Sequence, residues 1–99
     1  MAQTFQEAFA AQAPNLRGLH RRRALWLLSL PDDDPRKQAA FLHAEGVARR
    51  HLGLSPDEEV DWTEGANYGT EAAPKAINWQ QIIAALMAAL PAILKMFGC

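Results

Sequence analysis

The 99-residue chain contains one cysteine, at its last position, and its formal net charge is only −1. A single cysteine excludes an internal disulfide framework and any zinc site built from several cysteines. Ten basic against eleven acidic residues exclude a polycation that coats nucleic acid through bulk charge. The composition, with 49% apolar and 21% charged residues, is that of a small globular protein with one modest core.

Recognisable catalytic and metal-binding motifs are also missing. The histidines at 20, 43 and 51 are not spaced as metal ligands on one helix. The sequence contains no nucleophile elbow and no glycine-rich phosphate loop. We therefore predict a non-enzymatic protein with no catalytic residue, no cofactor and no metal ion, and the role of Cys99 stays open.

Residues 1–13 contain no basic residue and no apolar run of signal-peptide length, so they do not resemble a secretory leader. We expect a location in the cytoplasm or in an intracellular assembly, where Cys99 stays a thiol. The longest uncharged stretch, residues 76–94, contains Asn78, Gln80 and Gln81. It is a poor match to the ~20 predominantly apolar residues that span a bilayer, and a membrane location is kept as the alternative.

Capping and proline residues mark the first two helices. Thr4 and Glu7 match a capping box, in which each residue satisfies the backbone amide of the other. The helix that follows is expected to end before Pro14. A second helix is predicted over residues 16–30 and is stopped by Pro31.

The third helix has equally clear ends. Asp34 is the expected N-cap and Pro35 the first helical residue, where its missing N–H costs nothing. The helix is predicted over residues 35–52, and Gly53 supplies the left-handed residue after it. A further short helical turn is expected over residues 55–61.

These three helices are predicted to pack as an N-terminal cluster. The third helix has a polar side that includes Arg36 and His43, with Glu45 and Arg49 paired four residues apart. Phe5 is expected to close the cluster together with Phe9 from the first helix. The core residues expected from the other two helices are Leu16, Leu19, Trp26, Leu27, Leu30, Ala40, Phe41, Ala44, Val47, Ala48 and Leu52, with His51 at the boundary.

Four arginines lie within seven residues of the second helix, and they are the candidate contacts for an anion or a nucleic acid. Two other interpretations stay open: a solvated helix face, or pairing with an acidic block within the chain or between copies. The arginines are Arg17, Arg21, Arg22 and Arg23, and the acidic block consists of Asp57, Glu58, Glu59, Asp61, Glu64 and Glu71.

The acidic block also surrounds two apolar residues, Val60 and Trp62. Such a segment can dock onto a basic partner, or Trp62 can pack back onto the core. Residues 62–77 contain two glycines, an asparagine and a proline that break both helical and strand periodicity. We therefore expect an irregular connector here and no β-strand in the chain.

The most informative segment is the apolar helix predicted over residues 78–97. A helix that is apolar nearly all round must be covered nearly all round. Three environments would cover it: the core of the same domain, a groove on a protein partner or second copy, or a bilayer. Pro91 is expected to kink it. The bulky side chains predicted to bind a partner are Trp79, Ile82, Ile83, Leu86, Leu90, Ile93, Leu94 and Phe97.

Together these patterns predict an all-α fold of three short helices, an acidic irregular connector and one long apolar C-terminal helix. The parts are residues 1–61, 62–77 and 78–99 of a single domain. We predict a non-enzymatic structural or interaction subunit whose last helix docks into a larger assembly or self-associates. Membrane association through that helix is the alternative, and nucleic-acid contact through the arginines a weaker one. A chain truncated after Pro74 is then expected to stay folded, unless the last helix belongs to the core.

Overall fold

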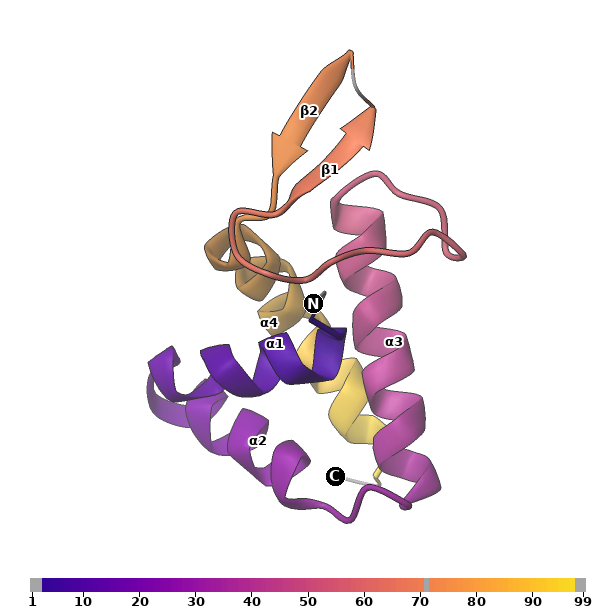
Figure 1. The fold of residues 1–99 in the computed structure, drawn as a ribbon. Helices are drawn as coiled ribbons and strands as arrows, with labels where there is room; N and C mark the ends of the chain where they lie inside the picture. Colours follow the sequence, from indigo (N-terminus) through magenta and orange to yellow (C-terminus); the bar gives the residue numbers. More distant parts are fainter. Residues whose placement is uncertain (1–2, 71, 98–99) are drawn as a thin grey trace.

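The computed structural model describes residues 3–70 and 72–97, apart from the side chains at 70 and 73. In Figure 1, α1 crosses in front of α4, α2 lies below α1, α3 runs along one side, and the hairpin of β1 and β2 projects at the top. The predicted mostly helical fold is confirmed, and the small sheet departs from the all-α prediction. The elements are α1 (Phe5–Gln12), the short 3-10 helix η1 (Ala13–Asn15), α2 (Gly18–Ser29), α3 (Pro35–His51), β1 (Asn67–Thr70), β2 (Ala73–Ala76) and α4 (Trp79–Lys95).

The predicted helix ends are confirmed where local side chains decide them. The Thr4 hydroxyl accepts from the Glu7 amide at 3.2 Å, and the Thr4 amide donates to the Glu7 carboxylate at 3.1 Å. Asp34 caps α3 by accepting from the Arg36 amide at 2.8 Å. Gly53, just after α3, has a φ of 74°, which favours glycine. These contacts span at most a few residues and need no tertiary packing.

The connector differs from the prediction of an irregular segment. Residues 67–70 pair antiparallel with residues 73–76, and Gly69 lies opposite Pro74. Pro74 is tolerated because a two-stranded sheet has only edge strands. At the base, the Ile77 amide donates to the Ala66 carbonyl at 2.8 Å, and Ile77 itself is buried. This anchoring organises a stretch whose glycines and proline favour no regular structure.

The short helix expected over residues 55–61 is also absent from the described chain. The Glu58 amide donates to the Ser55 carbonyl at 3.3 Å in a single turn, and the chain then runs extended. The Glu58 carbonyl accepts from Arg49 Nε at 2.9 Å, and the Trp62 amide donates to the Gln3 carbonyl at 3.2 Å. Contacts with α3 and with the start of the chain therefore replace helical hydrogen bonds.

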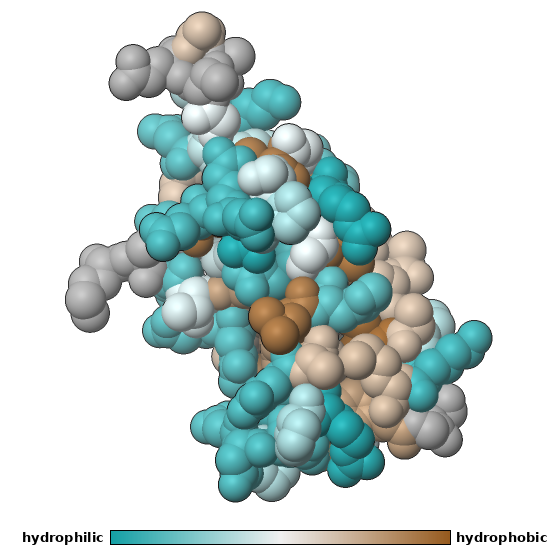
Figure 2. Space-filling model, turned by 90° about the vertical axis from the view of Figure 1, so that its right-hand side faces the viewer, coloured by the Kyte–Doolittle hydropathy of each residue, from teal (hydrophilic) through white to brown (hydrophobic). Residues whose placement is uncertain are grey.

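Helix α4 turns its bulky side inward and packs mainly against α3. Its outer side carries Ala84, Ala88 and Ala92, which are exposed. In the side view of Figure 2, moderately apolar side chains gather along the right, where α4 runs, beside a largely hydrophilic surface. The helix continues through Pro91 to Lys95. The structure therefore places the larger apolar side of this helix in the core of the chain itself.

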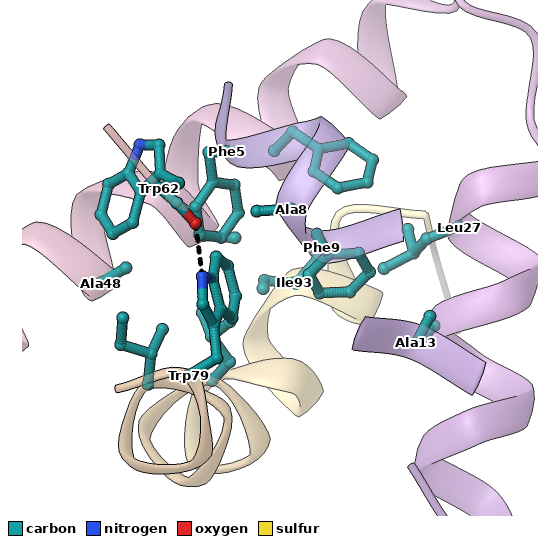
Figure 3. Close-up of a cluster of buried hydrophobic side chains, with 14 of the residues drawn as sticks. Phe5, Ala8, Phe9, Ala13, Leu27, Ala48, Trp62, Trp79 and Ile93 are labelled. Atoms are coloured by element: carbon teal, nitrogen blue, oxygen red, sulfur yellow. Dashed lines mark hydrogen bonds between the residues drawn. The ribbon is translucent and has the colours of Figure 1, made fainter. Parts of the chain in front are cut away.

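An aromatic cluster joins α1, the connector and α4. The rings of Phe5 and Trp62 meet edge to face, with centroids 5.2 Å apart, and Phe5 lies 5.7 Å from Trp79. The Trp79 indole donates to the Trp62 carbonyl at 2.6 Å, the bond drawn in Figure 3. Phe9 continues the cluster to Phe41 of α3 at 5.3 Å. The predicted closing role of Phe5 and Phe9 is confirmed, because both are buried.

The predicted core face of α3 is largely confirmed: Phe41 and the alanines at 40, 44 and 48 are buried. Arg49 pairs with Glu45 at 3.1 Å, as the spacing predicted. His51 is exposed and not at the core boundary, because α3 ends there, beyond the packed region. Two other core predictions are wrong: Leu19 and Trp26 are exposed, since α2 is buried only at Ala24 and Leu27.

One charged side chain, Lys37 at the start of α3, is buried within the described chain. Its ammonium donates to the carbonyls of Leu28 and Leu30, at 3.3 and 2.8 Å, and to Asp32 at 2.7 Å. The hydrogen bond from Lys37 holds the pKa of the Asp32 carboxyl below its usual range. Lys37 therefore satisfies carbonyls at the end of α2 that have no helical partner.

Truncation after Pro74 tests the role of α4 in the core. We now expect the truncated chain to lose its cooperative thermal transition in circular dichroism, because Phe5, Phe9 and Trp62 lose the surface that covers them. In the full chain, Leu86→Ala should lower the free energy of unfolding by about 2–5 kcal/mol, and the exposed control Ala88→Ser by less than about 0.5 kcal/mol. A truncated chain that still melts cooperatively would contradict this packing.

Lys37→Met tests the buried ammonium. The substitution fills the same volume but leaves the carbonyls of Leu28 and Leu30 without their donor, so we expect a loss of about 1–3 kcal/mol in urea unfolding. Lys95→Met removes an exposed ammonium from α4 and is the matched control, with an expected change within about 0.5 kcal/mol. Equal effects of the two substitutions would argue against the capping role.

Candidate functional site

The eight α4 residues predicted to bind a partner fall into two groups. Five of them are each at most 2% exposed and pack within the chain's own core, so they present no surface to a partner in this structure. The other three are half-buried. The buried residues are Trp79, Ile82, Leu86, Leu90 and Ile93, and the half-buried ones are Ile83, Leu94 and Phe97.

Helix α2 instead presents apolar side chains outward. Leu19 is 55% exposed, Leu25 41% and Trp26 40%. Two of its residues, Ala24 and Leu27, are buried against the rest of the molecule. A helix with apolar side chains on both its inner and its outer side leaves apolar surface exposed to solvent, and such surface is typical of interaction sites.

The four candidate arginines lie on the same helix or just before it. Arg17, Arg21 and Arg22 are exposed, and Arg23 is half-buried. In residues 3–70 and 72–97, none of their guanidinium groups makes an ion pair or a hydrogen bond. Pairing with the acidic block inside the chain is therefore not found among the residues described.

Arginine and apolar side chains meet between α2 and the end of α4. Arg22, Arg23, Trp26 and Leu94 line an open depression of about 300 Å³. The rings of Trp26 and Phe97 meet edge to face at 5.1 Å. The guanidinium carbon of Arg36 lies 5.5 Å from the centre of the Phe97 ring, within reach of a cation–π contact. We name this region the α2–α4 surface: Leu19, Arg22, Arg23, Trp26, Leu94 and Phe97.

Four residues of this surface are candidates from the sequence, and Trp26 is not among them. Leu94 and Phe97 were expected to contact a partner, and Arg22 and Arg23 an anion, but as separate sites. Trp26 was assigned to the core. The spacing in the sequence could have revealed the role of Trp26. It follows Arg22 by four residues and Arg23 by three, which places the three side chains on neighbouring parts of one helix surface.

The acidic block divides between structural and free carboxylates. Asp61 accepts from the Gln3 amide at 3.1 Å and from the Thr63 hydroxyl and amide at 2.6 and 3.0 Å. These hydrogen bonds, led by that of the hydroxyl, hold the pKa of the Asp61 carboxyl below its usual range. Glu64 accepts from the Trp79 amide at 2.9 Å, at the first turn of α4. Both residues thus fasten the connector to its neighbours.

Three further carboxylates, those of Asp57, Glu58 and Glu59, are exposed and make no ion pair or hydrogen bond within the described chain. Trp62, the predicted alternative anchor, is buried in the core. Glu71, the last member of the block, lies outside the described residues. The free part of the acidic block is therefore the segment that follows α3.

His20, His43 and His51 are exposed on separate parts of the helices. The part of the chain that the structure describes contains no group of three or more His, Cys, Asp or Glu side chains placed to hold a metal ion. Across residues 3–70 and 72–97, no helix has both the length and the hydropathy needed to cross a membrane. Cys99 lies outside the described residues.

Comparisons of the chain with protein-family models, with curated proteins and with solved structures found no match.

The pH dependence of stability tests the structural carboxylates. Because the pKa of Asp61 is lower in the folded chain than the usual value of about 3.9, its contribution is complete above that value and is lost as the pH falls further. We expect Asp61→Asn to flatten the fall in free energy of unfolding from pH 5 to pH 2, measured by urea unfolding. Asp33→Asn, at an exposed carboxyl that makes no hydrogen bond within the described part of the chain, is the control and should keep the parent slope. Parallel slopes for all three proteins would contradict the assignment.

Proposed function

We propose that this protein is a non-enzymatic interaction subunit that docks onto a protein partner through the α2–α4 surface. The proposal rests on the exposure and surroundings of Trp26. This residue is 40% exposed, its ring packs edge to face against Phe97, and it lines the same depression as Arg22 and Arg23. Tryptophan and arginine are the residues most enriched among those that dominate binding energy at protein interfaces. An exposed tryptophan that lines the same depression as two arginines, which make no ion pair within the described chain, therefore supports a docking site.

The position of Arg22 favours a protein over a lipid surface. At about 100° per residue, Arg22 lies on the outward side of α2, between Leu25 and the pair Leu19 and Trp26. A helix lying on a bilayer places its apolar residues at the centre and its charges at the flanks. A protein partner can instead place a carboxylate opposite Arg22 and apolar side chains around it.

In this proposal only the C-terminal end of α4 takes part in docking, whereas from the sequence the whole helix was expected to dock. Leu94 and Phe97 contribute to the surface, and the residues buried earlier in α4 support it from the core. The intracellular location expected from the sequence is kept with the proposal. Nucleic acid and anionic membranes remain the alternatives that the experiment must separate.

Trp26 offers a direct readout, because Trp62 and Trp79 are only 1% and 2% exposed. The probe is a synthetic amphipathic helical peptide with leucines on one face and glutamates flanking them. We expect the peptide to protect Trp26 fluorescence from acrylamide quenching. Trp26→Ala should weaken peptide binding by about tenfold or more, as measured by titration calorimetry.

The controls use the same protein and the same peptide length. Leu42→Ala, at an exposed leucine of α3 outside the surface, should leave the affinity unchanged. A peptide with lysines in place of the glutamates should not bind. Unchanged quenching with the acidic peptide, or protection by an oligonucleotide or by phosphatidylserine vesicles in its place, would overturn the proposal.

A further inference from the structure

Two sets of opposite charge, all exposed except for the half-buried Arg23, make no ion pair among residues 3–70 and 72–97. One is the group of arginines on and beside α2, and the other is the three carboxylates of Asp57, Glu58 and Glu59. Half-buried Leu54 and Val60 flank these carboxylates, so the segment 54–60 has both charges and apolar side chains to offer. This is the combination that the α2–α4 surface is suited to bind.

The two sets lie on opposite sides of one molecule. Figure 1 shows α2 at the lower left and the segment that follows α3 at the upper right. Neither set is therefore able to neutralise the other within the chain. We infer that segment 54–60 of a second copy docks onto the α2–α4 surface, an inference that rests on the proposed docking function of that surface.

The acidic segment is held in place for this contact. The Leu54 amide donates to the Arg49 carbonyl at 2.9 Å, and Arg49 Nε donates to the Glu58 carbonyl at 2.9 Å. The guanidinium of Arg49 also binds Glu45 at 3.1 Å, which fixes its position on α3. Because its backbone is hydrogen-bonded to Arg49 at Leu54 and at Glu58, the segment loses less conformational entropy on binding than a free loop would.

The overall charge allows copies to approach one another. The net charge of −1 gives little general repulsion, while the separated basic and acidic sets attract. Each copy carries both halves of the contact, so the interaction is either reciprocal in a closed dimer or repeated from head to tail. A contact based on seven residues and their counter-surface is a weak interface that salt should weaken further.

A charge exchange tests the inference on the full-length protein. The first variant is Arg21→Glu/Arg22→Glu/Arg23→Glu, and the second is Asp57→Lys/Glu58→Lys/Glu59→Lys. Sedimentation velocity of the parent should show concentration-dependent association that is lost at high salt. Each variant alone should associate about tenfold or more weakly than the parent, because its two surfaces then carry charge of the same sign. An equimolar mixture of the two variants should associate again.

Recovery in the mixture excludes unfolding as the cause of the loss. The single variant Arg22→Glu, at an exposed position, provides a milder version of the first, and circular dichroism confirms its fold. Lys75→Glu, on the exposed hairpin, changes the net charge without touching either set and should associate as the parent does. A parent that stays monomeric at every concentration, or a mixture that does not recover, would overturn the inference.

The two experiments together distinguish failure of self-association from failure of the proposed docking function. If the parent is monomeric but the acidic peptide still protects Trp26, the surface binds a foreign partner and only the second copy is rejected. If neither the peptide nor a second copy affects Trp26, the docking function itself fails.

Discussion

The indole of Trp79 donates a hydrogen bond to the backbone carbonyl of Trp62, and Phe5 packs over both rings. This contact joins the first helix, the connector and the last helix at one buried point. An indole N–H without an acceptor would be costly at this buried position, so the backbone at Trp62 has to lie beside the start of α4, where its carbonyl accepts this hydrogen bond. Asp61 and Glu64, on either side, fasten the same stretch to Gln3 and to the amide of Trp79.

With α4 held in this way, its bulky side becomes the centre of the core and α2 becomes peripheral. Ala24 and Leu27 of α2 reach the interior, and Lys37 fastens the end of the helix through its carbonyls. The opposite side of α2, with Trp26 and its neighbouring arginines, stays in contact with solvent. The proposed docking surface thus follows from the way the core is filled.

The charged side chains also fall into two groups, those that stabilise the fold and those that are exposed to solvent. Carboxylates that accept from a backbone amide or a hydroxyl, such as Asp61, stabilise the fold, while those of Asp57, Glu58 and Glu59 beyond α3 make no such hydrogen bond to any residue the structure describes. The arginines of α2 form no ion pair with a carboxylate of residues 3–70 and 72–97, and Asp32, beyond the end of the helix, is paired with Lys37. Small net charge and large local charge therefore coexist, a pattern suited to docking and not to uniform coating of a polyanion.

The sequence by itself determined the helices and their ends, because the caps at Thr4 and Asp34 and the left-handed Gly53 depend on neighbours within a few residues. It also determined that α4 needs cover, since its apolar side chains follow the helical period. Only the tertiary structure decided which apolar surface is covered. Trp26 and Trp79 are both bulky residues on apolar helix faces, and one is exposed while the other is buried. Likewise, the hairpin of the connector appears only in the tertiary structure, where Ile77 at its base is buried and hydrogen-bonded to Ala66. These choices depend on contacts between residues far apart in the chain, which helical periodicity and local capping do not encode.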